Sequence, residues 1–300
     1  GYLYLDALAL WMLIIVTMLY LAFAWTSKAY LDRDTNIRYG YLRRFSHLEG
    51  RFYALSHLFV WTMMIVVLVN NLGLMWVAIE ATTLVSALLV AFKFTRTSLE
   101  AAWKYVMVCT VGICLALLGT ILVYYAQILA MGGAQALDWQ YLAAHGGELN
   151  PALAKVAFCF LLVRYGPKGG LAPMHAWLPD AHSEAPALTS GLLSGALCIC
   201  AIYVLLRNVI VIMPAVGMGF ISSLFLFFGL LTIALAIPFV VIQRDIKRML
   251  AYSSMENFGL MAAGFGLFMP LAVEASLLHM MNHALVKYAL FYTAGTIMEA

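Results

Sequence analysis

Charged residues are scarce in this sequence: Asp, Glu, Lys and Arg make up 10% of its 300 residues, whereas 65% are hydrophobic and the mean hydropathy is +0.94. Soluble domains carry about 25% charged residues, so this composition excludes a soluble globular protein. The sequence has no basic surface interleaved with aromatic residues, so no nucleic-acid partner is expected. It also has no phosphate-binding loop.

Cysteine is sparse as well, and all five cysteines fall in apolar stretches without a C-x-x-C pair or a histidine at ligand spacing: Cys109, Cys114, Cys159, Cys198 and Cys200. The pattern excludes a disulfide framework, an iron–sulfur site and a haem site, and we expect these side chains to serve packing. No metal or cofactor site is therefore expected in this chain. The energy that drives it must come from another subunit or from an ion gradient.

Long hydrophobic runs, by contrast, are abundant. A membrane-spanning helix needs roughly 20 apolar residues, and nine segments qualify: 5–25, 54–70, 72–93, 102–126, 152–182 with an interruption, 187–207, 217–242, 250–269 and 272–298. The sequence thus predicts an all-α, polytopic transmembrane bundle of about nine helices. Because it begins at Gly1 and stops within a helical pattern, we expect an excerpt of a longer polypeptide.

Basic residues gather in alternate connections between these segments: Lys28, Arg33, Arg38, Arg43, Arg44, Arg51, Lys93, Arg96, Lys104, Arg244, Lys247 and Arg248. Only Lys155 and Arg207 lie near the other ends. Since basic residues accumulate on the cytoplasmic side, these connections are predicted to be cytoplasmic and the polar segment 127–151 external. Aromatic residues near the segment ends are predicted to anchor the protein at the membrane interface, for example Trp25, Trp103 and Tyr203.

Among the ionisable residues within the apolar segments, six are singled out as candidates: Glu80, Arg164, Lys168, His279, His283 and Lys287. A charge at the bilayer centre costs about 2.5–3.5 kcal/mol on insertion scales, so an ionisable residue there indicates a functional site. We therefore expect these groups to form a proton relay.

Lys168 lies within Gly166-Pro167-Lys168-Gly169-Gly170, a run that breaks or loosens a helix. Broken membrane helices are tolerated where they face protein or a water-filled cavity, and in transporters they mark ion sites. We expect water to reach Lys168 and Glu80 to act as its partner. A carboxylate that approaches the lysine favours the ammonium form, and one that leaves favours proton release. A second interpretation is that Glu80 is a hydrogen-bonded carboxyl that holds helices together.

His279, His283 and Lys287 follow one another at intervals of four residues, which places them on one helical face. Histidine titrates near neutral pH, and lysine can store a proton. The spacing predicts the second part of the relay.

Five further residues are secondary candidates with two interpretations each. Asp180, His182 and Glu184 either gather protons at a cytoplasmic entrance or cap and solvate a turn. Glu256 either caps a helix, since Ser253-x-x-Glu256 has the spacing of a capping box, or belongs to the relay. Arg164, one turn before Lys168, either repels the lysine or reaches a neighbouring carboxylate.

The segments 71–92, 164–186, 245–254 and 279–287 together resemble the antiporter-like subunits shared by respiratory complex I, Mrp sodium/proton antiporters and energy-converting hydrogenases. The resemblance covers about residues 4–298. Two runs, Ala78-Ile-Glu80-Ala-Thr-Thr and Tyr252-Ser-Ser-Met-Glu256-Asn, are most similar to the membrane subunits of hydrogenase-4 and formate hydrogenlyase complexes.

The resemblance implies inverted five-helix repeats, each with a discontinuous helix. Residues 1–53 would form a transmembrane helix and a basic cytoplasmic loop, 54–207 the first repeat with its break near 166–170, and 208–300 an incomplete second repeat. Glu80, Lys168 and the row 279–287 match the family's relay positions. The sequence departs from the family at Ser194, where many relatives have histidine or lysine, and at Ile113, where some have aspartate. Since a hydroxyl cannot store a charge, Ser194 is the weak point of the expected relay.

The implied function is that of a non-redox, proton-translocating subunit in a membrane-bound nickel–iron hydrogenase or formate hydrogenlyase of a bacterial or archaeal cytoplasmic membrane. Partners would be lipid, other antiporter-like subunits and a peripheral redox arm that carries iron–sulfur clusters and a nickel–iron centre or flavin. The alternatives are a cation/proton antiporter, a complex I quinone oxidoreductase subunit, a non-pumping scaffold and a subunit coupled to inorganic-carbon uptake.

Overall fold

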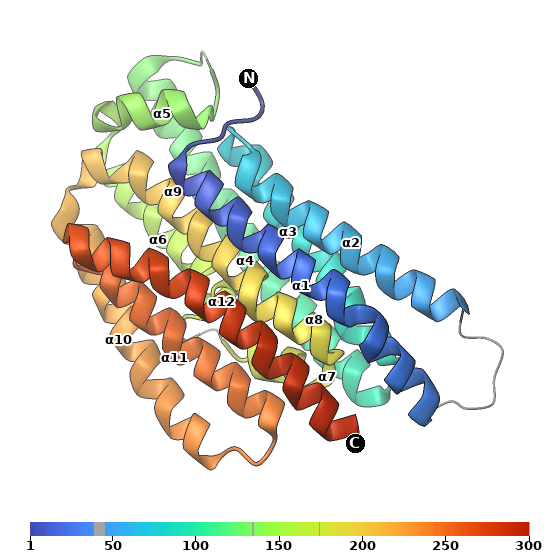
Figure 1. Ribbon diagram of the computed structural model, residues 1–300. Helices are drawn as coiled ribbons and strands as arrows, with labels where there is room; N and C mark the ends of the chain where they lie inside the picture. The colour runs from blue at the N-terminus through green and yellow to red at the C-terminus, as the bar shows by residue number, and fades with distance from the viewer. Residues whose placement is uncertain (39–45, 134, 174, 300) are drawn as a thin grey trace.

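The computed structural model describes residues 1–38, 46–133, 135–173 and 175–299. These residues form an all-α bundle, as predicted, in which long helices run side by side and the short helix α5 covers one end (Figure 1). The helices are α1 (Ala7–Arg38), α2 (Ser46–Leu68), α3 (Leu72–Val90), α4 (Arg96–Met131), α5 (Trp139–His145), α6 (Pro151–Lys168), α7 (Trp177–Glu184), α8 (Ala187–Leu192), α9 (Cys198–Val216), α10 (Met218–Ile242), α11 (Ile246–Gly266) and α12 (Pro270–Glu299). Short turns η1 (Ala91–Lys93), η2 (Gly146–Glu148) and the π-helical η3 (Leu193–Leu197) link some of them.

Six helical stretches of the described chain are long and apolar enough to cross a membrane: Ala7–Asp32, Leu48–Leu68, Leu72–Lys93, Arg96–Met131, Ala187–Val216 and Met218–Ile242. The predicted count of nine spans is not confirmed by this measure. The other three predicted spans correspond to α6 with α7, to α11 and to α12. These helices contain Arg164, Lys168, Lys247 and Lys287, and such residues lower the hydropathy of the helix that carries them.

Helix ends follow local caps more than the limits of the apolar runs. Helix α4 begins at Arg96 because the side chain and backbone of Thr95 pair reciprocally with Ser98, six residues before the predicted apolar run. Helix α11 begins at Ile246, where the side chain of Asp245 accepts a hydrogen bond from the N–H of Arg248 at 2.7 Å. The predicted capping box at Ser253 and Glu256 is therefore wrong: both residues lie well inside α11.

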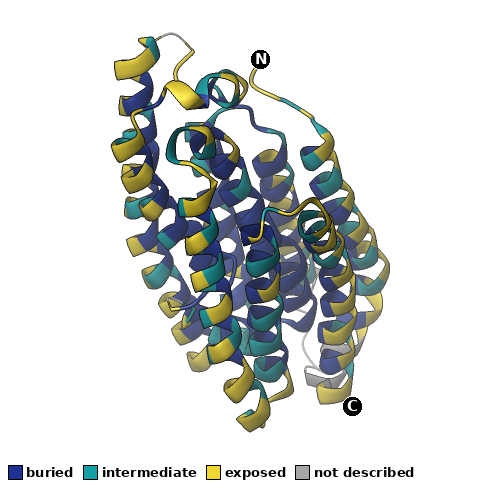
Figure 2. Ribbon diagram, turned by 90° about the vertical axis from the view of Figure 1, so that its left-hand side faces the viewer, coloured by how far each residue is buried: buried dark blue, intermediate teal, exposed yellow. Residues whose placement is uncertain are grey.

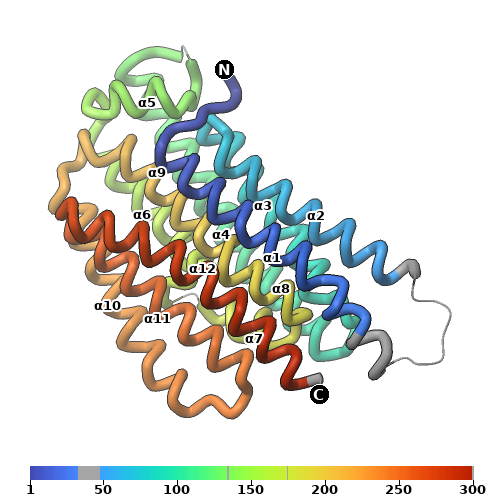
Figure 3. Tube along the Cα trace, in the orientation of Figure 1, coloured from blue at the N-terminus to red at the C-terminus, as the bar shows by residue number. Residues whose placement is uncertain are grey.

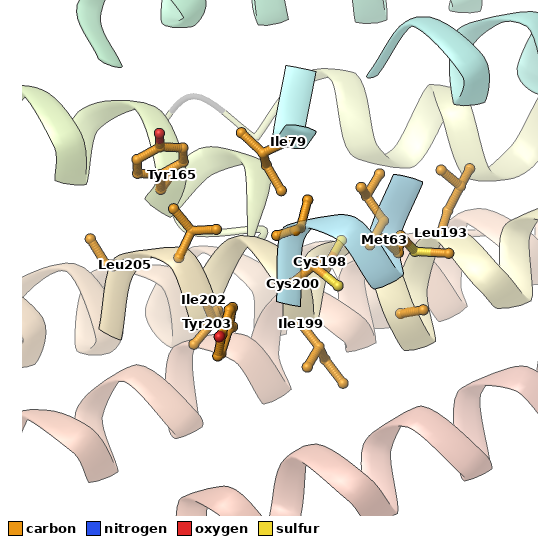
Figure 4. Packing of buried hydrophobic residues seen from close by; sticks show 14 of the residues in the cluster. Met63, Ile79, Tyr165, Leu193, Cys198, Ile199, Cys200, Ile202, Tyr203 and Leu205 are labelled. Carbon is orange, nitrogen blue, oxygen red and sulfur yellow. The ribbon is translucent and has the colours of Figure 1, made fainter. Parts of the chain in front are cut away.

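Buried residues face the bundle axis and exposed ones face outward (Figure 2). Helices α8 and α9 with η3 form the most enclosed run, drawn in yellow at the centre of the tube in Figure 3. Cys198 and Cys200 of α9 lie in this packed centre (Figure 4), and Cys109 is also buried. Cys114 and Cys159, however, are exposed, so the prediction that all five cysteines serve core packing is wrong for these two.

The outer surface is apolar, with residues such as Val241 and Leu271 more than three-quarters exposed. A surface of this kind fits lipid as the surrounding solvent. Trp25 and Trp103 are exposed, as expected for interface anchors, but Tyr203 is fully buried and the same prediction is wrong for it.

The α3–α4 and α10–α11 connections both lie at the end of the bundle opposite α5 (Figure 1). The basic residues of these two connections therefore share one end, as the alternation predicted. The centre of the predicted basic loop, which includes Arg43 and Arg44, lies outside the described residues. The proposed division at residues 53 and 207 stays a prediction.

Candidate functional site

A broken helix forms the centre of the site. Helix α6 ends at Lys168 and α7 begins at Trp177, so the predicted discontinuity is confirmed. Gly170 has a φ of +89°, a conformation that favours glycine. The backbone groups freed by the break find protein partners: Trp177 Nε1 donates to the carbonyl of Pro167 at 3.2 Å, and Ala172 N donates to Thr232 Oγ1 at 2.9 Å. The break is thus stabilised from within the bundle.

Glu80 of α3 pairs directly with Arg164 of α6. Arg164 Nη2 lies 2.7 Å from each carboxylate oxygen, and Arg164 Nε lies 3.2 Å from Oε1. Both side chains are buried, with exposed fractions of 3% for Arg164 and 11% for Glu80. Gly112 of α4 makes room for the guanidinium, since a Cβ there would lie 2.4 Å from Arg164 Cδ. Of the two roles predicted for Arg164, contact with a neighbouring carboxylate is therefore the one observed.

Lys168 reaches the same carboxylate only indirectly. Its Nζ donates to the carbonyl of Ile79 at 2.5 Å and to the hydroxyl of Thr83, and Thr83 Oγ1 in turn donates to Glu80 Oε2 at 3.2 Å. The predicted direct Glu80–Lys168 pair is not formed, because Arg164 occupies both carboxylate oxygens. Lys168 is also 0% exposed, so the expectation of open access to water is wrong for this conformation.

Ser194, the expected weak point, lies in the π-helical turn η3 and bonds to α11. Its Oγ lies 2.8 Å from Ser254 Oγ, which donates to the carbonyl of Leu250 at 2.9 Å. Lys287 Nζ of α12 donates to the same carbonyl at 3.1 Å. Through this shared acceptor, Ser194 is connected to Lys287 rather than to His279. Single π-helical turns within α-helices occur frequently at functional sites.

The three predicted residues of α12 differ in their surroundings. His283 and Lys287 are 4% and 3% exposed, whereas His279 is half-buried and its Nε2 lies 2.8 Å from Asn257 Oδ1. The ring of His283 packs at 4.6 Å from that of Phe258, and its Nε2 has no partner among the described residues. The three residues therefore lie on one helix, as predicted, and Lys287 is the most deeply buried of them.

The secondary candidates differ in their burial and in their partners. Asp180 forms ion pairs with Lys104 at 3.4 Å and Arg248 at 2.9 Å, and Glu184 accepts a hydrogen bond from Thr97 at 2.8 Å. His182, between them in sequence, is 0% exposed. The enclosed ring of His182 is thus not part of a surface cluster with Asp180 and Glu184, and an entrance role for these two carboxylates stays a prediction. Glu256 is half-buried, and its charge acts on Lys287 across the α11–α12 contact.

Sequence reasoning missed one buried ion pair near the α5 end of the bundle. Arg207 of α9 holds Asp6 with Nη1–Oδ2 and Nη2–Oδ1 distances of 2.6 and 2.7 Å. Its Nε donates to Tyr203 Oη at 2.7 Å, and its guanidinium lies 4.2 Å from the ring of Trp139. The signal was an arginine near the end of an apolar run without an acid on its own helix. The cluster joins α9 to the segment before α1 and to α5, which is a structural role.

In the described part of the chain, no group of three or more His, Cys, Asp or Glu residues could hold a metal ion. The arrangement at the helix break instead presents one carboxylate to two buried basic side chains.

Comparison with known proteins places this arrangement in context. Residues 69–300 match the protein family described as NADH:quinone oxidoreductase/Mrp antiporter, transmembrane. The chain is 42% identical over 231 residues to the hydrogenase-4 component F homolog of Methylacidiphilum infernorum, covering 77% of this chain and 48% of that protein. It is 31% identical over 258 residues to NADH-quinone oxidoreductase subunit N of Desulforudis audaxviator, covering 83% and 48%.

A third relative, hydrogenase-4 component B of Escherichia coli, is 27% identical and is matched by 98% of this chain over 43% of its own length. The chain thus spans about half the length of these relatives. Among solved structures, a chain of the membrane-bound sulfane sulfur reductase, an archaeal respiratory membrane complex, superimposes with a TM-score of 0.84 at 23% identity. That match covers 98% of this chain and 56% of the other, and it supports the fold.

Proposed function

Because this chain belongs to the NADH:quinone oxidoreductase/Mrp antiporter membrane family, we propose that it translocates protons as a non-redox subunit of a redox-driven membrane complex. One observation carries the proposal: two buried basic side chains, Arg164 and Lys168, lie within reach of one carboxylate, Glu80, at the break in a helix. Buried ionisable groups in membrane helices mark proton and ion paths, and broken helices mark their binding sites.

The proposed switch is a change in the partner of Glu80. In the described conformation Arg164 neutralises Glu80, and the two acceptors of Lys168 Nζ are neutral oxygens. A lysine so placed releases its proton more readily than one beside a carboxylate. If the carboxylate turns from Arg164 toward Lys168, the ammonium form is favoured and a proton is taken up. Alternation between these two arrangements would move one proton per cycle.

We propose that the released proton travels toward α12. The hydroxyls of Ser194 and Ser254 connect the π-helical turn to the carbonyl that accepts from Lys287. These hydroxyls cannot store a charge, but they can orient water molecules that carry a proton. Lys287, His283 and His279 would then receive it in turn.

The partner complex is proposed to be a hydrogenase or formate hydrogenlyase. The 42% identity to a hydrogenase-4 component F homolog supports this assignment. Iron–sulfur clusters and a nickel–iron centre or flavin would lie in the partner's redox arm. The end with the basic α3–α4 and α10–α11 connections is proposed to face the cytoplasm of a bacterial or archaeal cell.

A sodium-driven antiporter is less well supported, because a sodium site needs several clustered oxygen ligands. Both carboxylate oxygens of Glu80 are already bound by Arg164. Protons are therefore the preferred cargo.

The test is reconstitution of the complete complex in liposomes, with redox turnover and formation of a pH gradient measured together. Glu80→Gln and Lys168→Ala are expected to abolish the gradient. Lys155→Ala changes an exposed lysine on the same helix α6 and is the matched control. Full pumping by both buried-site variants would reject the proposal, and sodium-dependent transport without a redox substrate would favour an antiporter.

A further inference from the structure

His182 is the most enclosed histidine in the described chain and has no polar partner for its ring. It is 0% exposed, and neither Nδ1 nor Nε2 has a hydrogen-bond partner among the described residues. Buried polar groups are nearly always hydrogen-bonded, so two unpaired nitrogens on one ring require an explanation. A ring whose two nitrogens are both free is able to accept a proton on one side and release one on the other.

The chain segment that follows His182 is held by Lys247 at the start of α11. Lys247 is buried, and its Nζ donates to the carbonyls of Ser183, at 3.0 Å, and Ala185, which follow His182 by one and three residues. These two hydrogen bonds fix the end of α7 against the beginning of α11. His182 therefore lies next to the basic end of the bundle that is proposed to face the cytoplasm.

The ring of His182 itself lies against α12. Its ring stacks on Phe291 with centroids 5.1 Å apart and an angle of 18° between the planes. Phe291 follows Lys287 by one helical turn, so both residues share a face of α12. Phe291 also packs against Leu250, whose carbonyl accepts the hydrogen bond from Lys287. Lys247 and Lys287 are both near enough to the His182 ring to interact with it electrostatically. His182 is near enough to His283 for the same kind of interaction.

We propose that His182 is a proton-transfer residue between the basic end of the bundle at Lys247 and the buried Lys287 on α12. The inference rests on the proposed proton-translocating function and assigns that function an entry point. A neutral imidazole accepts a proton on its free nitrogen and releases the proton carried by the other nitrogen, so the ring returns to the neutral form with its tautomer reversed. The step requires no oxidant or reductant. In it water at the basic end of the bundle supplies the proton, Lys247 positions α7, and the neutral amine of Lys287 receives the proton.

Two substitutions separate proton transfer from packing. His182→Phe preserves a ring that stacks on Phe291 but has no nitrogen, whereas His182→Gln preserves polar atoms without a titrating group. In the complete complex in liposomes, both variants are expected to slow proton uptake roughly 100-fold, the low end of general acid–base effects. His57→Gln, which changes an exposed histidine on the outer face of α2, is the control for loss of an imidazole.

Normal pumping by His182→Phe would reduce the residue to a packing role and overturn the inference. If Glu80→Gln and Lys168→Ala lose pumping while both His182 variants retain it, the inference fails and the proposed function stands. If the Glu80 and Lys168 variants also pump normally, the proposed function itself fails. Should neither His182 variant assemble, Phe291→Leu decides, because it keeps both nitrogens of His182 and removes only the ring that stacks on it. Slowed proton uptake in Phe291→Leu supports the inference, and wild-type uptake contradicts it.

Discussion

Arg164 of α6 holds both carboxylate oxygens of Glu80 of α3 at the buried centre of the bundle. A planar guanidinium matches a carboxylate with two parallel hydrogen bonds, which a lysine cannot do. The pair therefore has a defined geometry, and Lys168 is left one helical turn away with Thr83 as the intermediary. This competition for one carboxylate leads to the first three predictions.

Substitution of Arg164 by methionine should release Glu80 toward Lys168. Removal of one partner of a buried ion pair lowers the free energy of unfolding by about 3–5 kcal/mol. The loss should lie near the lower figure here, because Lys168 becomes the new partner of Glu80. Pumping should also fall, because the lysine would be held as the ammonium. Thermal unfolding and pH-gradient formation of the reconstituted complex measure the two effects. If the double variant Glu80→Gln, Arg164→Met is no more stable than Arg164→Met alone, the broken ion pair is not the cause of the loss in stability.

Substitution of Thr83 by valine should disconnect Lys168 from Glu80 without a change of side-chain shape. Thr83 Oγ1 accepts from Lys168 Nζ and donates to the carboxylate, and an unsatisfied buried donor costs about 1–3 kcal/mol. We expect a slower proton release step in single-turnover measurements. Thr82→Val is the matched control, since Thr82 is equally buried and its hydroxyl donates to the carbonyl of Ile79. Equal effects of the two variants would count against a bridging role for Thr83.

Substitution of Gly112 by alanine should reproduce part of the Arg164 defect. The added methyl group would lie 2.4 Å from Arg164 Cδ, so the arginine must move away from Glu80. Pumping should fall while the α4–α6 packing elsewhere is unchanged. Gly133→Ala, at a position with no atom within 4 Å of the new methyl group, serves as the control. A variant with normal pumping would show that Arg164 has room to adapt.

The helix break and the buried ionisable residues were predictable from the sequence because proline, glycine and charge stand out against an apolar background. The pairing between them was not. Glu80 and Arg164 are 84 residues apart, and the relative rotation of α3 and α6 decides whether Arg164 or Lys168 faces the carboxylate. A single sequence contains the period of each helix but not this rotation.

Local signals also competed with one another. The spacing from Ser253 to Glu256 resembles a capping box, but Asp245 caps α11 two turns earlier, so the same spacing lies inside a helix. Asp6 lies at the start of the first apolar run and gave no sign of its partner Arg207, since long-range pairs depend on which helices are neighbours. Ser194, in contrast, was singled out by its departure from related sequences, and the structure shows its contact with Ser254.

The Asp6–Arg207 pair predicts a pH dependence of stability. Burial alone would raise the pKa of Asp6, but hydrogen bonds from Arg207 and from the N–H of Ala9 outweigh it and lower the pKa below its ordinary value of 3.8. The carboxylate therefore contributes stability above pH 3.8, and the contribution is lost as the pH falls through the lowered pKa. Asp6→Asn should cost about 2 kcal/mol at pH 7, because a buried arginine loses its charged partner.

Unfolding of wild type and Asp6→Asn should be compared from pH 7 to pH 3. The difference between them should be constant above pH 3.8 and narrow as the pH falls below it. Glu148→Gln alters an exposed acid near the α5 end and should match wild type throughout. A difference that is constant across this range would mean that the charge of Asp6 does not contribute.

The Ser194–Ser254 contact tests whether the two halves of the proposed relay are joined at this point. If these hydroxyls orient the water that carries protons toward Lys287, Ser194→Ala and Ser254→Ala should each slow pumping, and the double variant should be no worse than either alone. Ser276→Ala is the control, because Ser276 is a buried serine of α12 that also donates to a carbonyl one turn earlier. Additive losses would indicate two independent packing defects, whereas wild-type pumping in both single variants would place the path elsewhere. In the latter case protons released by Lys168 would not pass η3. Protons that enter through His182 would then reach Lys287 without passing Lys168.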